Sequence, residues 1–284
     1  MELMRRVRRR MRPAIRSLQA IARWRRLSFV ETPPIFGNAK PKSGSHLLVQ
    51  VLTGFTRIMP CRYVEAEPIR TITKAGSRRP QEDILDDLRR LPQGVIGWGY
   101  VEATPENVVL LCRPDRVNYF IFRDPRDMLV SQVYFATEMH EEHGMHAYYQ
   151  GLPDFGERLK VSITGLDQNG LKMVSVRERY DGVLRWREQE HVLCVRYEDF
   201  LGRLDATLRA MLDQVERIGY RIPTPRERAI KVLGESIQPS KSRTFRSGKA
   251  GGWREYFTAE HKRLFMHVAG DLLVRLGYEK NDVW

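Results

Sequence analysis

Cysteine is scarce in this chain of 284 residues, and long apolar runs are missing. The three cysteines, Cys61, Cys112 and Cys194, are odd in number and widely spaced, which argues against a disulfide framework or a zinc site of paired cysteines. No apolar run approaches the ~20 residues needed to cross a bilayer. Repeats of fixed period and low-complexity interior linkers are also lacking. We therefore expect a protein of a reducing, cytoplasmic compartment.

Basic charge is plentiful but unevenly distributed. The formal net charge is +13, and residues 1–26, with ten arginines and one glutamate, carry +9 of it. The whole chain is 42% hydrophobic, and the sequence after the arm is long enough for a substantial core. These features predict a basic N-terminal arm over residues 1–28 and a single domain over residues 29–284.

The arm combines its arginines with apolar residues at helical spacing. This pattern suits adsorption to an anionic membrane surface, so the protein would be peripheral to the membrane. A solvated basic tail is the open alternative. Nucleic acid is not an expected partner, because no zinc-finger, KH or RRM motif accompanies the charge. The apolar positions of the arm are Met4, Val7, Met11, Ile15, Leu18 and Ala22.

Strand and helix patterns alternate along the remaining sequence. Short apolar runs predict strands over residues 33–38, 94–100, 117–122 and 191–196. Helical patterns occupy residues 47–52, 81–90, 126–137, 201–218 and 259–276, and Gly277 suits the end of the last helix. Such alternation predicts an α/β three-layer sandwich with a central parallel sheet, whose ligands bind at the carboxyl ends of the strands.

Three segments have the composition of anion-binding loops. Pro41–Leu47 contains Lys42 and two serines, Arg123 is followed eight residues later by Ser131, and Arg246–Trp253 is rich in basic residues and glycine. Each lies where a strand or loop gives way to a helix, a place where free N–H groups bind phosphate-like anions. Three such segments suggest one ligand with several phosphate or sulfate groups.

These segments together resemble the sulfotransferases that use 3′-phosphoadenosine 5′-phosphosulfate (PAPS). Residues 41–45 resemble the family's phosphosulfate loop, usually Tyr-Pro-Lys-Ser-Gly-Thr, and residues 246–253 are similar to its C-terminal Arg-Lys-Gly-x-x-Gly-x-Trp loop. Arg123 and Ser131 look like its 3′-phosphate site, and Tyr197–Phe200 resembles a segment near the adenine. A kinase P-loop fails on spacing, because Lys42 stands where a second glycine is required after Gly37.

The resemblance implies a P-loop-like fold, PAPS as co-substrate and transfer to a hydroxyl acceptor. Lys42 would stabilise the oxygen that leaves sulfur, and a guanidinium fork from Arg123 would hold the 3′-phosphate. Ser247 replaces the usual lysine of the C-terminal loop, which should weaken 3′-phosphate binding. The expected PAPS-binding residues are Lys42, Ser43, Gly44, Ser45, His46, Arg123, Ser131, Tyr197, Arg246, Ser247 and Gly248.

The general base is where the sequence departs from the family. Many relatives place a histidine where this chain has Tyr100, so we expect Glu102, two residues later, to take the acceptor proton beside Tyr100. His46 and the pair His140 and His143 stay open as alternatives. No metal is expected, since this histidine-rich stretch does not form an HExxH motif.

Two functions are consistent with these patterns. The first is a sulfotransferase acting on a small-molecule or lipid-linked hydroxyl acceptor, such as a glycolipid or another membrane-near molecule. The second is a nucleotide- or polyanion-binding protein that kept the fold and lost the base. The acceptor itself has no motif, because the stretches 62–80 and 137–165 predict loops around its pocket.

Overall fold

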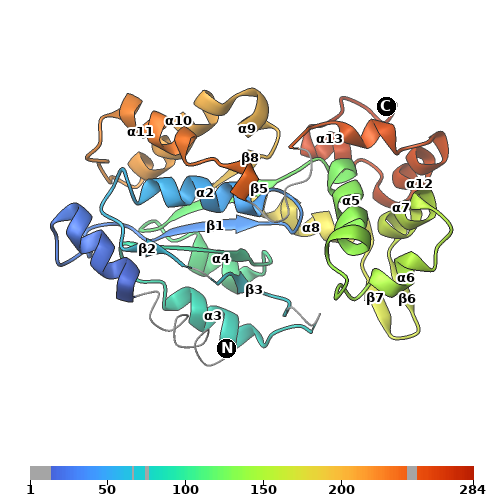
Figure 1. The fold of residues 1–284 in the computed structure, drawn as a ribbon, viewed down its shortest axis with the longest axis horizontal. Helices are drawn as coiled ribbons and strands as arrows, with labels where there is room; N and C mark the ends of the chain where they lie inside the picture. The colour runs from blue at the N-terminus through green and yellow to red at the C-terminus, as the bar shows by residue number, and fades with distance from the viewer. Residues whose placement is uncertain (1–13, 66, 74–76, 242–247) are drawn as a thin grey trace.

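The computed structural model describes residues 14–65, 67–73, 77–241 and 248–284. Its centre is a parallel sheet with the strand order β2-β4-β1-β5-β8 (Figure 1). A short strand, β3, pairs with the carboxyl end of β4. The strands are β1 (Ile35–Ala39), β2 (Tyr63–Val64), β3 (Ile69–Arg70), β4 (Val95–Tyr100), β5 (Val117–Phe122) and β8 (Val192–Arg196).

The chain reverses direction across the sheet at β1. From β1 it first builds β2, β3 and β4 on one side, then crosses to β5 and β8 on the other, so β4 and β5 flank β1. Crevices open at the carboxyl end of such a switch point. The loops after β1, β4 and β5 therefore meet at one edge.

Helices cover both faces of the sheet. One face packs on α2 (Ser45–Phe55), α10 (Leu204–Arg217) and α11 (Arg226–Glu235) through a core that includes Ile35, Leu52 and Tyr119. The opposite face packs on α3 (Gln81–Arg89), α4 (Pro105–Leu111) and α8 (Val176–Arg187) through Phe36 and Phe120. Successive residues of a strand point to opposite faces, so both faces of these strands are apolar. The predicted three-layer α/β sandwich is confirmed.

A helical layer extends the second core beyond the edge of the sheet (Figure 1). The elements of this region are α5 (Pro125–Tyr134), a π-helix (Phe135–Met139), α6 (His146–Gln150), α7 (Phe155–Thr164), the hairpin β6 (Leu166–Gln168) and β7 (Leu171–Met173), a 3-10 turn (Gly252–Glu255), α12 (Ala259–Ala269) and α13 (Leu272–Leu276). The helix α5 contacts α7, and α7 contacts α12.

Several sequence predictions need correction. The helix expected over 259–276 is two helices, because Gly270 has φ +54° and ends α12. The helix expected over 201–218 is likewise two, α9 (Asp199–Gly202) and α10, separated by Arg203. The stretch 137–165 is not a loop, since it contains α6 and α7. The four predicted strands and the left-handed cap at Gly277, with φ +76°, are confirmed.

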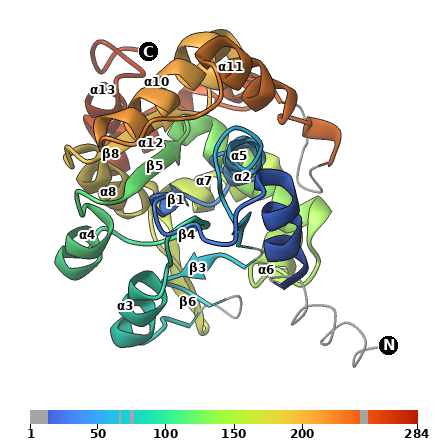
Figure 2. The ribbon, with the colours of Figure 1, turned by 90° about the vertical axis from the view of Figure 1, so that its left-hand side faces the viewer.

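Part of the basic arm packs on the domain. Residues 14–24 form a helix that lies beside α2 (Figure 2). Ala20 is buried, and the Trp24 indole donates to the Thr56 carbonyl at 3.1 Å. Ile15 and Leu18 stay 47% and 65% exposed. The other predicted apolar positions before residue 14, which are Met4, Val7 and Met11, lie outside the described residues.

Candidate functional site

The loop after β1 has the backbone of an anion-binding turn. Lys42 adopts φ +66°, a left-handed conformation that non-glycine residues rarely adopt. Gly44, the N-cap of α2, has φ +94°, and a Cβ there would lie 2.6 Å from the Tyr197 ring. Among the described side chains none caps this helix, and its first turn holds no acidic residue. The first N–H groups of α2 and its dipole thus favour an anion at this turn.

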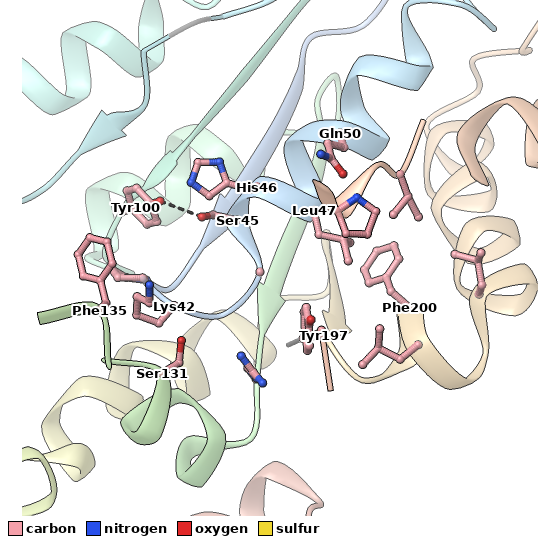
Figure 3. Close-up of a pocket in the computed structure, with 18 of the residues that line it drawn as sticks. Lys42, Ser45, His46, Leu47, Gln50, Tyr100, Ser131, Phe135, Tyr197 and Phe200 are labelled. Carbon is pink, nitrogen blue, oxygen red and sulfur yellow. Dashed lines mark hydrogen bonds between the residues drawn. The ribbon is translucent and has the colours of Figure 1, made fainter. Parts of the chain in front are cut away.

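A pocket of about 680 Å³ opens at this loop, at the carboxyl edge of the sheet. Figure 3 shows Lys42, Tyr100 and Ser131 at one side of it and Phe200 at the other. The Ser45 and Tyr100 hydroxyls are hydrogen-bonded at 2.9 Å. The predicted site residues that line the pocket are Lys42, Gly44, Ser45, His46, Tyr100, Arg123, Ser131, Tyr197 and Gly248.

Arg123 is held against the pocket by contacts from three segments. Its guanidinium lies 4.5 Å above the Tyr197 ring and donates to the Lys249 carbonyl at 2.9 Å. Asp127 is 3.7 Å from the same guanidinium. The Nε atom of Arg123 is buried and has no hydrogen-bond partner among the described residues. Because a buried unpaired donor is costly, this atom suits an incoming anion.

Asp127 ties the C-terminal loop to α5. Its carboxylate accepts the N–H groups of Gly251 at 2.7 Å and Trp253 at 2.8 Å. These bonds place Gly248, four residues before the 3-10 turn, in the lining of the pocket near Arg123. The motif from sequence included residues on both sides of this contact but missed Asp127. An aspartate in the first turn of a helix is common, so nothing distinguished it.

The segment after β8 supports the Arg123 loop. Glu198 accepts the Asp124 N–H at 3.1 Å and the Tyr278 hydroxyl at 2.8 Å. Burial raises the pKa of Glu198, and the hydrogen bond from Asp124 opposes that shift. The Tyr197 N–H donates to the Phe122 carbonyl at 2.8 Å, which continues the pairing of β5 and β8. The two hydrogen bonds that Glu198 accepts hold this segment in place, and the neighbouring Tyr197 lines the pocket.

Two of the predicted residues that the structure describes, Ser43 and Glu102, are not among those that line the pocket. Ser43 is fully buried, and its N–H donates to the Lys40 carbonyl at 3.1 Å, so its N–H is not presented to the pocket as expected. The Glu102 carboxylate instead accepts a hydrogen bond from Arg78 at 2.7 Å. Arg246 and Ser247 lie outside the described residues.

Lys40 lies where the related loop usually has tyrosine. Burial lowers its pKa to about 8, Arg179 lowers it further, and Glu102 acts in the opposite direction. The Glu102 carboxylate is paired with Arg78, while Tyr100, two residues earlier, reaches the donor loop through its bond to Ser45.

Histidines lie on both sides of Lys42. Burial lowers the pKa of His46, and the Lys42 charge lowers it further. Burial, His140 and Lys42 lower the pKa of His143 in the same direction. The Nδ1 atom of His143 accepts the Met145 N–H at 3.2 Å, so that nitrogen is occupied. His46 alone among these three lines the pocket.

Further residues complete the pocket, and among them Phe135 and Arg70 were not predicted from sequence. Phe135, from the π-helix, lies with its ring centroid 3.8 Å from the Lys42 ammonium, and Arg70 lies 4.9 Å above the Tyr100 ring. The far side is mainly apolar. Its lining includes Leu47, Phe200, Leu201, Leu204, Ile237 and Pro239.

Two features are absent from the described part of the chain. Within it, no cluster of three or more His, Cys, Asp or Glu side chains is arranged to hold a metal ion. No helix there is long and apolar enough to span a bilayer.

Comparisons with known proteins give one family model and several solved structures of similar fold. A family model described as "Sulfotransferase domain" matches residues 119–277, more than half of the chain. The fold is similar to mouse sulfotransferase SULT7A1 complexed with PAP, with a TM-score of 0.56 and 18% identity over 87% of this chain and 86% of that one. It is also similar to retinol dehydratase in complex with androsterone and inactive cofactor PAP, with a TM-score of 0.56 and 14% identity over 86% of this chain and 83% of that one. A search of curated proteins gives no match.

Proposed function

This chain belongs to the sulfotransferase family, and we propose that it transfers the sulfuryl group of PAPS to a hydroxyl acceptor, leaving 3′-phosphoadenosine 5′-phosphate (PAP). The observation that carries the proposal is the convergence of the Lys42 loop and Arg123 on one pocket. Two of the solved structures with this fold hold PAP, which supports the choice of donor. Release of PAP that depends on an acceptor tests it.

The described residues fit such a nucleotide. The α2 N-terminus would hold the 5′-phosphate, and Gly44 leaves room for the backbone to approach it. The unpaired Nε of Arg123 would bind the 3′-phosphate, together with the Ser131 hydroxyl. The apolar side at Phe200 would receive the adenine. This assignment gives the 5′-phosphate and the 3′-phosphate of the donor a partner each.

The transfer step needs charge stabilisation and a proton acceptor. The acceptor oxygen attacks sulfur as the bond from sulfur to the phosphate oxygen breaks, and the acceptor proton passes to a base. Lys42 would stabilise the negative charge on the departing oxygen, because its ammonium is a compact, movable charge at the tip of the loop. Phe135 covers this ammonium and would exclude water from it.

We assign the base to His46 rather than Glu102. His46 lines the pocket beside Ser45, and its lowered pKa keeps the ring neutral at pH 7, the form that accepts a proton. Glu102 is paired with Arg78 and does not line the pocket. Tyr100 would position the donor loop through its bond to Ser45.

Arg123→Ala should weaken PAP binding by about tenfold to a hundredfold, because charge-assisted bonds contribute ~1.5–3 kcal/mol each. Binding of adenosine 5′-phosphosulfate, which has no 3′-phosphate, should change far less. Calorimetry with both nucleotides measures the difference. Equal losses for the two would place the 3′-phosphate elsewhere, and Arg185→Ala, at an exposed position on α8, is the matched control.

The acceptor is proposed to be membrane-near, such as a glycolipid. The support is the basic arm, whose ten arginines within residues 1–26 favour an anionic membrane surface. The exposed Ile15 and Leu18 would enter the interface. The protein would then act in the cytoplasm at the membrane surface.

A further inference from the structure

A second cavity, of about 590 Å³, lies between the helix over residues 14–24, α2 and β2. We call it the arm pocket. Its charged lining consists of Arg16 and Arg23 from the helix, Arg57 after α2, Arg62 before β2, and Glu65. His46 lines both this cavity and the donor pocket. Four arginines against one glutamate make it a basic cavity that the transfer step does not use.

Backbone carbonyls hold two of the arginines that line the arm pocket. Arg16 donates to the Val64 carbonyl, and Arg23 donates to the Thr56 carbonyl at 3.3 Å. Arg57 reaches Glu235, outside the cavity, at 3.9 Å. Guanidinium groups positioned in this way retain further N–H donors, because each carries five. Several such groups around one cavity suit a phosphate with two negative charges better than a diester with one.

Apolar side chains beside the arm pocket indicate where that phosphate comes from. Ile15 and Leu18 belong to the helix that lines the cavity and are exposed, and Leu27 and Val30 follow it at 88% and 72% exposure. A free phosphate in water would make no contact with these apolar side chains. A membrane lipid would contact them, because its acyl chains lie below the head group.

We propose that the arm pocket binds the phosphomonoester head group of a membrane lipid while these apolar side chains enter the interface. The inference rests on the proposed membrane contact of residues 1–26. It adds phosphomonoester lipids as a ligand class, so the protein would recognise a particular head group rather than adsorb to any anionic surface. Because His46 borders both cavities, the lipid would lie beside the donor pocket, where a membrane-near acceptor must arrive.

Vesicle flotation of the full chain tests the proposal. Phosphatidylcholine vesicles carry either phosphatidic acid, a phosphomonoester, or phosphatidylglycerol, a phosphodiester, at matched surface charge. We expect about tenfold tighter binding to phosphatidic acid, and loss of that preference in the double variant Arg23→Gln, Arg57→Gln. The control Arg185→Gln, Arg228→Gln removes the same charge from exposed sites outside the cavity and should keep the preference.

The other outcomes overturn the proposal in different ways. Equal binding to both lipids would leave only adsorption by charge. Calorimetry that finds sn-glycerol 3-phosphate bound as tightly as the vesicles would assign the cavity to a free phosphate. Absence of flotation with either lipid would also refute the proposed membrane contact of residues 1–26. PAP affinity measured on the same variants should stay unchanged, so sulfuryl transfer is judged separately from all these results.

Discussion

Replacing Lys42 with alanine should lower turnover by a factor of a hundred to a thousand. Electrostatic stabilisation of a departing oxygen typically contributes ~3 kcal/mol, and this contribution acts mainly as the bond breaks. Alanine keeps the Cβ at a position with φ +66°, so the backbone conformation is no harder to adopt than before. Donor affinity should fall less than turnover. Single-turnover kinetics with PAPS separate the two effects.

Two further lysine variants sharpen the Lys42 result. Lys172→Ala removes a charge from the exposed end of the β7 hairpin and should leave turnover unchanged. Lys42→Arg keeps the charge but replaces a compact ammonium with a planar fork, so it should recover only part of the rate. Turnover of Lys42→Ala close to that of the unmodified protein would remove Lys42 from the transfer step.

His46→Asn should reduce kcat/KM by about a hundredfold or more, the size expected for loss of a general base. The neutral ring is the active form, so kcat/KM should fall as the pH drops through the pKa of His46, which lies below its ordinary value of 6.5. Above pH 7 the profile should be flat. The variant should lose this acid limb while it still binds PAP.

The pKa of His46 provides a readout that a structural role would not move. Lys42 lowers this pKa, so NMR titration of the His46 ring in Lys42→Ala should show a rise toward the ordinary value. Glu102→Gln removes the charge that pairs with Arg78 and that raises the pKa of Lys40, and it should change kcat/KM by a few-fold at most. A large loss in Glu102→Gln with little in His46→Asn would restore the assignment made from sequence.

The strands and the donor loop were predictable because their patterns are local. Strands such as Val117–Phe122 are short, mainly apolar runs, and the lysine-serine-glycine turn lies directly before a helix. The break at Gly270 was not predictable, because one glycine in a helical pattern is often tolerated. The stretch 137–165 was misjudged since its polar residues mask the apolar contacts of α7 with α5 and α12.

The site was predictable only as far as motifs reach. Residues of the Lys42 loop, Arg123 and Tyr197 share one pocket as expected, because carboxyl ends of parallel strands meet at one edge. Glu102 was placed by assuming that an extended chain keeps alternate residues on one face. The Glu102 side chain instead points to Arg78, a residue from another segment of the chain with which it forms an ion pair. Asp127, Phe135 and Arg70 act through contacts that no spacing encodes.

Transfer of labelled sulfate from PAPS across a panel of hydroxyl acceptors tests the central claim most directly. The account predicts that at least one acceptor class gives a labelled sulfate ester together with an equal amount of released PAP. Lys42→Ala should lose both products while it still binds PAP. Tight PAP binding with no acceptor-dependent release in any class would contradict the account and identify a nucleotide-binding protein that kept the sulfotransferase fold without its reaction.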